Sequence, residues 1–384
     1  MLGNRKLICD TFCEVYDLLK PWIDHDFFNF REHTIIPGAI YMIGRAQVNL
    51  NVDKIKNIAE NNLATIIISN PAEGSETLKH HMQRIGLMDL CVSGRILLLG
   101  GGDMEPEFKF LCFDSFLPKI FDYEENVQAS SQITEIFTKQ NKPYKFLFLN
   151  GRARPNRKYL LHYFQHIGLL DQTIWTNLDT FTGTTSEIHC YINNEDLMLH
   201  NMPIKLLDEK YEVDRYRSNL QKQYGTGWAK NDLFEYQGGM EWGDVYINPA
   251  PYIDSYFSVV TETIFTYPYS FRTEKLWKPI AMGHPFVVVS NQGYYRDLHN
   301  LGFKTFGHLI DENFDTIQHN LTRLKRMRDV IVDLCNSDLP SFLSAARDVC
   351  EYNQTHLWEM RDKVRNEFPH RYREFLIEQG VINE

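Results

Sequence analysis

The sequence predicts an α/β protein with two doubly wound parallel sheets. Short apolar runs alternate with amphipathic helical stretches in both halves, and this alternation is typical of parallel strands joined by helical crossovers. At 384 residues the chain is long for a single core. Hydrophobic residues form 43% of it and aromatic residues 13%, which suffices to fill two cores. We therefore expect two globular domains, followed by helices at the C-terminus.

The first domain is expected over residues 1–135. After a helix over 9–19, the pattern predicts strands over 39–43, 64–70 (ended by Pro71) and 95–99, with helices over 53–61 and 76–85 between them. The last strand precedes Gly100-Gly101-Gly102, which lacks the Gly-x-Gly-x-x-Gly spacing of a dinucleotide site. We expect this triplet to form a loop that lets backbone approach a ligand or the other domain.

The second domain is expected over residues 136–330, after a polar linker within 128–143. The predicted strands cover 146–150, a run that starts at Ser258, 286–289 and 303–306. Between about 180 and 250 the alternation gives way to a polar, aromatic and glycine-rich stretch, too long for a plain connection. We expect an insertion there that covers a ligand or shapes a pocket, and helices over 331–384.

A strand, a loop, a helix and a second strand over residues 258–290 carry the features of a ligand site. Thr273 is a good N-cap residue, which places Glu274 and Lys275 in the first turn of a helix that Gly283 ends. The N–H groups and dipole of such a helix start favour a diphosphate, and a carboxylate accepts hydrogen bonds from a ribose diol. The same pattern fits equally well an ordinary strand-helix-strand unit with solvated charges.

A second strand-loop-helix unit starts at residue 146. Its strand ends at Asn150, and Arg152, Arg154 and Arg157 crowd the turn before a helix that Gly168 closes. Guanidinium groups bind phosphate oxygens in a bidentate manner, and open α/β sheets bind ligands at the carboxyl ends of their strands. Three arginines within six residues would also suit a solvated loop, but their position favours an anion site.

Together these units resemble glycosyltransferases of the GT-B type, most closely the α1,3-fucosyltransferase family and its exostosin-like relatives. The residues that carry the resemblance are Thr261-Glu262-Thr263, Phe271-Arg272-Thr273-Glu274-Lys275, Gly283-His284-Pro285-Phe286-Val287-Val288, and the pair Asn150 and Arg157. It covers roughly residues 144–315. It implies two Rossmann-like domains that face a cleft, with nucleotide sugar bound by the second, the acceptor on the side of the first, and terminal helices that pack back toward the first.

By the same resemblance, Glu274 holds the ribose of the donor, Lys275 and Arg157 hold its diphosphate, and Glu262 lies on its sugar or ribose side. The donor is a nucleoside-diphosphate sugar of the GDP or UDP type, with no other cofactor. Thr263 stands where the family has Asn, and Phe271-Arg272 where it has Tyr-Val, so the donor sugar is left open between a fucose-like sugar and another hexose.

The reaction implied is inverting transfer to an acceptor hydroxyl, which needs a base. Carboxylates at strand ends of the first domain make Glu73 and Asp103 the candidates, with Asp114 third. Each such residue is more often a turn or cap residue than a base. His80, His81 and His284 are weaker candidates, because a lone histidine more often has a structural role.

Bulk properties limit the partners. The net charge of −10 disfavours non-specific binding to nucleic acid or to an anionic membrane. Seven scattered cysteines without a Cys-x-x-Cys pair suggest reduced thiols, and the absence of a long apolar run or signal-peptide core suggests a cytoplasmic protein without a membrane span. Cationic side chains in the loops predict donor binding without a metal ion. Asp311, Glu312 and Asp315 follow the strand expected over 303–306, far in sequence from these loops, and are expected to form a surface turn and helix start.

The acceptor remains open between a glycan, a small hydroxylated molecule and a modified nucleobase. Two alternatives to a transferase also remain open on the same scaffold. One is a nucleotide-sugar epimerase, which binds the same donor but needs no acceptor. The other is a non-catalytic nucleotide-sugar-binding protein.

Overall fold

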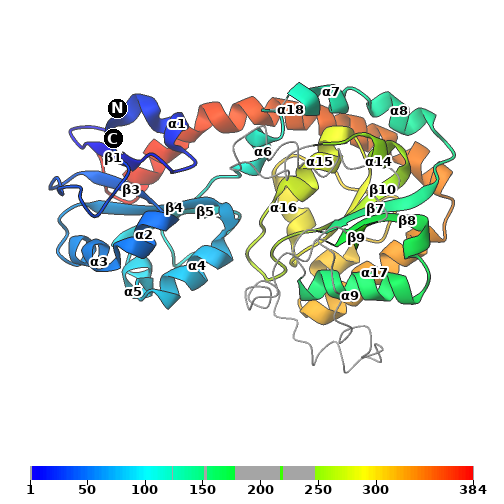
Figure 1. Ribbon diagram of the computed structural model, residues 1–384, viewed down its shortest axis with the longest axis horizontal. Helices are drawn as coiled ribbons and strands as arrows, with labels where there is room; N and C mark the ends of the chain where they lie inside the picture. The colour runs from blue at the N-terminus through cyan, green and yellow to red at the C-terminus, as the bar shows by residue number, and fades with distance from the viewer. Residues whose placement is uncertain (1, 123, 151–153, 178–216, 219–246, 384) are drawn as a thin grey trace. The chain divides into compact units, whose positions relative to one another are not determined.

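The computed structural model describes residues 2–122, 124–150, 154–177, 217–218 and 247–383. It divides into two compact units, the first made of Met1–Pro118 with Met360–Glu384 and the second of Lys119–Glu359. Each unit contains one sheet with helices on both of its faces (Figure 1). The predicted α/β class with two sheets of parallel strands is confirmed. The GT-B arrangement of the two domains about a cleft stays a prediction.

Unit 1 contains a sheet of six parallel strands in the order β2-β1-β3-β4-β5-β6. The strands are β1 Leu7–Asp10, β2 Ile23–Phe27, β3 Ile40–Gly44, β4 Thr65–Gly74, β5 Ile96–Gly101 and β6 Phe110–Cys112. The helices are α1 Tyr16–Leu19, α2 Arg45–Leu50, α3 Val52–Glu60, α4 Ser75–Arg84, α5 Met88–Val92 and, at the boundary to unit 2, α6 Phe116–Lys119. The strand order follows the doubly wound pattern of sheets that bind ligands at their carboxyl edge.

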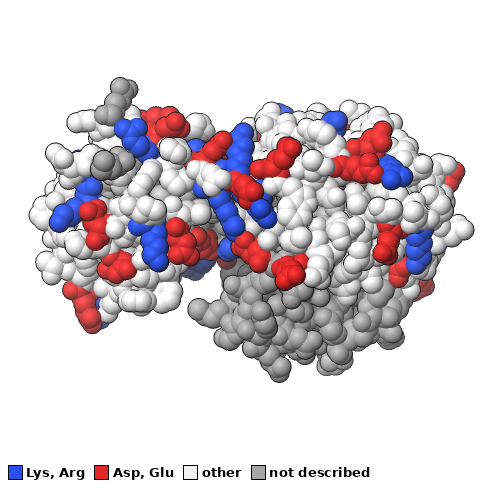
Figure 2. Space-filling model, turned by 90° about the horizontal axis from the view of Figure 1, so that it is seen from above, with Lys and Arg blue, Asp and Glu red and all other residues white. Residues whose placement is uncertain are grey.

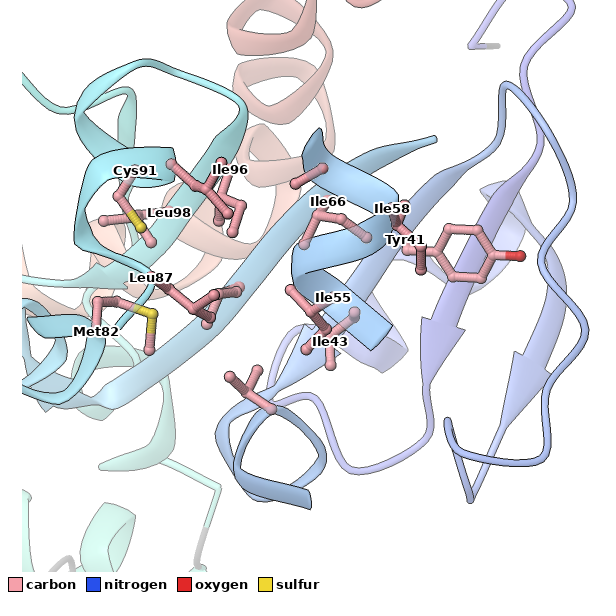
Figure 3. Close-up of a cluster of buried hydrophobic side chains, with 14 of the residues drawn as sticks. Tyr41, Ile43, Ile55, Ile58, Ile66, Met82, Leu87, Cys91, Ile96 and Leu98 are labelled. Carbon is pink, nitrogen blue, oxygen red and sulfur yellow. The ribbon is translucent and has the colours of Figure 1, made fainter. Parts of the chain in front are cut away.

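The core of unit 1 lies on both faces of this sheet because side chains alternate along each strand. One face packs against α3, α4 and α5 (Figure 3); its strand residues include Tyr41, Ile43, Ile66, Ile68, Ile96 and Leu98. The intervening residues, such as Ile40, Met42, Ile67 and Leu97, lie on the other face in one cluster with Phe368 and Tyr372. These two belong to α18, which covers Leu339–Glu378. The last turns of α18 therefore complete the core of unit 1.

The first element of unit 1 differs from the prediction. The helix expected over 9–19 is wrong, since Leu7–Asp10 is a fully buried strand between two others and only Tyr16–Leu19 is helical. The strands β2 and β6 were not predicted either, because β2 is largely polar and β6 has three residues. Pro71 does not end β4, which continues to Gly74 after a shift of register past Asn70. Such an irregularity accommodates a residue without an N–H donor.

The glycine triplet is only partly a loop. Gly100 and Gly101 belong to β5, and Gly102 alone has a left-handed φ, of 78°. A Cβ at Gly100 would lie 3.0 Å from the ring of Phe110. The close approach at this position is therefore made by a side chain of the same core.

Unit 2 contains a five-stranded sheet in the order β11-β10-β7-β8-β9. Its strands are β7 Tyr144–Asn150, β8 Thr173–Asn177, β9 Arg217–Ser218, β10 Ser255–Thr261 and β11 Phe286–Val289, of which only β9 is antiparallel to its neighbour. Helix α9, Pro155–His166, follows β7, and helix α15, Glu274–Met282, follows β10. They lie on opposite faces of the sheet (Figure 1). Further helices are α7 Glu124–Ser130, α8 Ile133–Thr138, α14 Ala250–Ile253, α16 Tyr294–Asn300 and α17 Asn320–Cys335.

Unit 2 differs from the sequence-based expectations at residues 303–306 and 128–143. Residues 303–306 are not a strand; Phe303 packs on Trp277 and Phe306 on Phe286, so these residues are apolar because they fill the core. The stretch expected as a linker, 128–143, contains α8 and the end of α7. The insertion expected at about 180–250 lies outside the described residues, except for Arg217–Ser218 and the residues from 247 onward.

The connections of unit 2 create a switch point at the carboxyl edge of its sheet. From β7 the chain passes through α9 to β8 on one side, and it returns to β10 on the other side of β7. Neighbouring loops leave in opposite directions at such a point, which is where open α/β sheets bind ligands. Among the described residues, no helix is both long and apolar enough to cross a bilayer.

Candidate functional site

The carboxyl ends of β7 and β10 are joined by side chains. Asn150 ends β7 and Thr261 ends β10; both are buried, and the Thr261 hydroxyl donates to Oδ1 of Asn150 over 2.6 Å. Thr261 was not among the predicted site residues. Its bond fixes the two strand ends from which the predicted loops leave.

Arg157 connects the start of α9 to the same place. It lies in the first turn of α9, it is buried, and its Nη2 donates to the main-chain oxygens of Thr261 (2.9 Å) and Glu262 (3.2 Å). Arg154, also buried, is the N-cap residue of α9 and has extended backbone. The structure thus brings two of the three predicted arginines to the switch point. Arg152 lies outside the described residues.

Glu262 follows β10 and is fully buried. Its Oε1 accepts from the Thr273 N–H (3.0 Å) and the Tyr294 hydroxyl (3.1 Å). Its Oε2 accepts from the Thr273 hydroxyl (2.8 Å) and the Thr263 N–H (3.2 Å). Burial raises the pKa of Glu262, and the charge of Lys275 with the bonds from Thr273 offsets only part of that rise. Glu262 therefore holds the loop before α15 in place.

The first turn of α15 has the capping geometry that the sequence predicts. The Thr273 hydroxyl accepts from the Lys275 N–H over 3.3 Å, and Lys275 Nζ lies 3.2 Å from the same oxygen. Lys275 also forms an ion pair with Glu274. Burial alone would raise the pKa of Glu274, but the charges of Lys275 and Lys278 outweigh it and hold this pKa below its ordinary value. The turn therefore presents an ionised carboxylate and an ammonium group side by side.

Arg323, a fully buried residue of α17, holds the far end of the loop, and no sequence pattern singles it out. Its guanidinium donates five hydrogen bonds, to the main-chain oxygens of Ser290, Ile317, Gln318 and Phe265 and to Oδ1 of Asn320. Burial lowers its pKa to about 10, so it stays charged at neutral pH. Because its hydrogen bonds reach both the loop after β10 and the end of β11, Arg323 holds these two segments together.

The candidate bases lie at the carboxyl ends of three neighbouring strands of unit 1. Glu73 is near the end of β4, with its Oε1 3.8 Å from Nη1 of Arg45. Asp103 follows β5, and its main-chain oxygen accepts from the Ser75 hydroxyl. Asp114 follows β6, and its main-chain oxygen accepts from the Leu117 N–H over 3.2 Å. The position at strand ends is as expected, and their role as base stays a prediction.

The three histidines have different surroundings. His284 is fully buried, with Nδ1 2.9 Å from the Ser258 hydroxyl and Nε2 2.9 Å from the Ser255 oxygen, and burial lowers its pKa to about 3. Since it precedes β11, at the amino end of the sheet, its role is structural. Burial together with the charges of nearby arginines lowers the pKa of His81 to about 4. Burial also lowers the pKa of His80.

The acidic residues near position 312 have separate partners. Asp311 pairs with Arg326, Glu312 accepts from Thr305 and from the Phe306 N–H, and Asp315 accepts from two N–H groups at the start of α16. Within the described part of the chain, no three His, Cys, Asp or Glu side chains come together as a metal site requires. Metal independence stays a prediction. On the face of unit 2 shown in Figure 2, acidic and basic side chains are scattered among uncharged ones.

The chain matches no protein-family model, and searches among curated proteins and solved structures return no match. These comparisons therefore assign no family. The interpretation of the site depends on its geometry and chemistry.

Proposed function

We propose that this protein is a glycosyltransferase that takes its sugar from a nucleoside-diphosphate donor bound by unit 2. The observation that carries this proposal is the convergence of two helix starts, α9 and α15, beside the ends of β7 and β10. Both helix starts carry cationic side chains, and a helix N-terminus with such side chains favours a phosphate group.

The residues have different roles in this proposal. Lys275 and the start of α9 with Arg154 bind the diphosphate. The ionised Glu274 accepts hydrogen bonds from the ribose hydroxyls. Glu262 is a positioning residue, because its two oxygens already accept four hydrogen bonds within the protein. Arg157 anchors α9 to the end of β10, and a contact of Arg157 with the diphosphate stays a prediction.

In the proposed reaction, the bond between the anomeric carbon and the phosphate oxygen breaks, and its electron pair leaves with the nucleoside diphosphate. The acceptor hydroxyl oxygen forms the new bond to the anomeric carbon, and its proton passes to a base. The cations and helix dipoles of unit 2 stabilise the charge on the leaving group. We assign the acceptor and the base, Glu73 or Asp103, to unit 1, with inversion of configuration.

Calorimetric titration with GDP, UDP and their sugars tests the donor site. Lys275→Ala removes a charge-assisted contact worth about 1.5 to 3 kcal/mol, so the affinity for the nucleotide that binds is expected to fall roughly ten- to a hundred-fold. Lys363→Ala, which removes an exposed charge from α18, is the matched control and should bind like the wild type. Equal affinity in Lys275→Ala and the control would contradict the proposed site.

A further inference from the structure

Asn156, the second residue of α9, has an unusual environment. Its side chain is 1% exposed, and neither Nδ2 nor Oδ1 has a hydrogen-bond partner among the described residues. Buried amides in native proteins are nearly always hydrogen-bonded. A buried amide without partners costs free energy comparable to the bonds that it lacks. The side chain thus reduces stability unless a group outside the described residues completes its bonds.

The location of Asn156 points to a ligand. It lies between Arg154, the N-cap residue, and Arg157, whose guanidinium bonds to the end of β10. Helix α9 has twelve residues, and its start is one of the two that converge at the switch point. An unsatisfied polar side chain at a helix start of this kind is open to a hydrogen bond from a bound molecule.

We propose that Asn156 determines the specificity of the site by binding a part of the donor that offers a hydrogen-bond donor and an acceptor together. The carboxamide has N–H groups and a carbonyl oxygen, and here both ends lack partners. Diphosphate oxygens only accept, so they satisfy Nδ2 and leave Oδ1 unpaired. A vicinal pair of sugar hydroxyls, or a base edge with an N–H beside a carbonyl, satisfies both. This inference rests on the proposed function, since it names a contact within the same donor site.

The test compares Asn156→Leu with Asn353→Leu. Asn353 of α18 is equally buried, but its Oδ1 accepts from the Lys304 N–H and its Nδ2 donates to the Lys304 oxygen, each over 2.8 Å. Asn353→Leu should therefore lower the Tm and keep nucleotide affinity. Asn156→Leu, an apolar replacement of similar size, should leave the Tm of the ligand-free protein unchanged or raise it. It should also weaken binding of the nucleotide sugar ten-fold or more, or about 1.4 kcal/mol.

Three ligands locate the contact. Inorganic pyrophosphate should bind Asn156→Leu and the wild type equally. If the nucleoside diphosphate loses as much affinity as its sugar conjugate, the contact is to the base or ribose; if only the conjugate does, the contact is to the sugar. If Asn156→Leu lowers the affinity for pyrophosphate as much as the affinity for the nucleotide sugar, the proposed specificity is contradicted.

Other outcomes separate this inference from the proposed function. A Tm of Asn156→Leu that falls as far as that of Asn353→Leu would show a structural role. If Lys275→Ala weakens binding of both the nucleoside diphosphate and its sugar conjugate while Asn156→Leu weakens neither, this inference alone would be overturned. A wild-type protein that binds no nucleotide would overturn both.

Discussion

Glu262 shows how the chemistry of a single residue organises the proposed site. Its two oxygens hold residues 11 and 32 positions further along the chain, so the loop before α15 and the start of α16 share one anchor. The sequence marks Glu262 as a polar residue after an apolar strand, which suffices to nominate it. The sequence does not reveal that groups of the protein itself donate hydrogen bonds to both carboxylate oxygens, because the contacts to Thr273 and Tyr294 depend on the tertiary fold.

Glu262→Gln should lower the free energy of unfolding by about 1 to 3 kcal/mol. Each oxygen of Glu262 accepts a main-chain N–H, one from Thr273 and one from Thr263, so an amide group faces a donor in either orientation. Urea denaturation measures the change. Glu367→Gln on the exposed surface of α18 is the control and should unfold like the wild type. If Glu262→Gln changes the free energy of unfolding as little as this control does, the anchoring role of Glu262 is contradicted.

The raised pKa of Glu312 predicts that the free energy of unfolding depends on pH. Burial raises its pKa to about 7, from an ordinary value of 4.5. The folded protein therefore binds more protons than the unfolded chain between these values, so this residue's contribution is fully present below pH 4.5 and is lost as the pH rises through 7. Glu312→Gln should flatten this part of the stability curve, since the Thr305 hydroxyl is able to rotate and accept from an amide. Denaturation at pH 5 and pH 8 measures it, and an unchanged difference between the two would contradict the assignment.

Helix α15 is the element that the sequence predicts best. Thr273 is its N-cap and Gly283 its left-handed C-cap, as the hydroxyl of threonine and the lack of a Cβ in glycine suggest, because capping depends on residues close in sequence. The same reasoning fails for Leu7–Asp10. Four buried residues suit a strand or a helix equally well, and only pairing with two distant strands decides between them. In the same way, Asn150 and Arg157 were predictable as polar residues at a strand end and helix start, whereas Arg323 and Asn156 become notable only through their surroundings.

Gly283→Ala should destabilise the protein for two reasons. Gly283 has a φ of 65°, where an L-residue costs about 1 to 2 kcal/mol, and a Cβ there would collide with Ile133 of α8. Gly168, at the end of α9, has a φ of 72° but no atom within 4 Å of such a Cβ. Gly168→Ala therefore reports the backbone cost alone. Thermal unfolding should show the larger loss for Gly283→Ala, and equal losses would contradict the packing between α15 and α8.

At the scale of the whole molecule, unit 1 combines the two ends of the chain, whereas unit 2 is one continuous segment. The last turns of α18 bring Phe368 and Tyr372 into one cluster with residues of β1 and β3, although more than 300 residues separate them in sequence. Alternating apolar strands predict two sheets, and this part of the fold follows from local pattern. The assembly of unit 1 from both ends of the chain does not follow from local pattern, because no local pattern specifies the partner of a distant helix.

Hydrogen–deuterium exchange tests the central claim, nucleotide binding at the switch point of unit 2, most directly. The full-length protein is compared with and without a saturating nucleoside diphosphate, chosen as the one that raises the Tm most. We expect slower exchange at the start of α9, residues 155–160, and in the loop and first turn over 271–277, with no change over α17. Protection confined to unit 1, or exchange at both helix starts that the nucleotide leaves unchanged, would contradict the account.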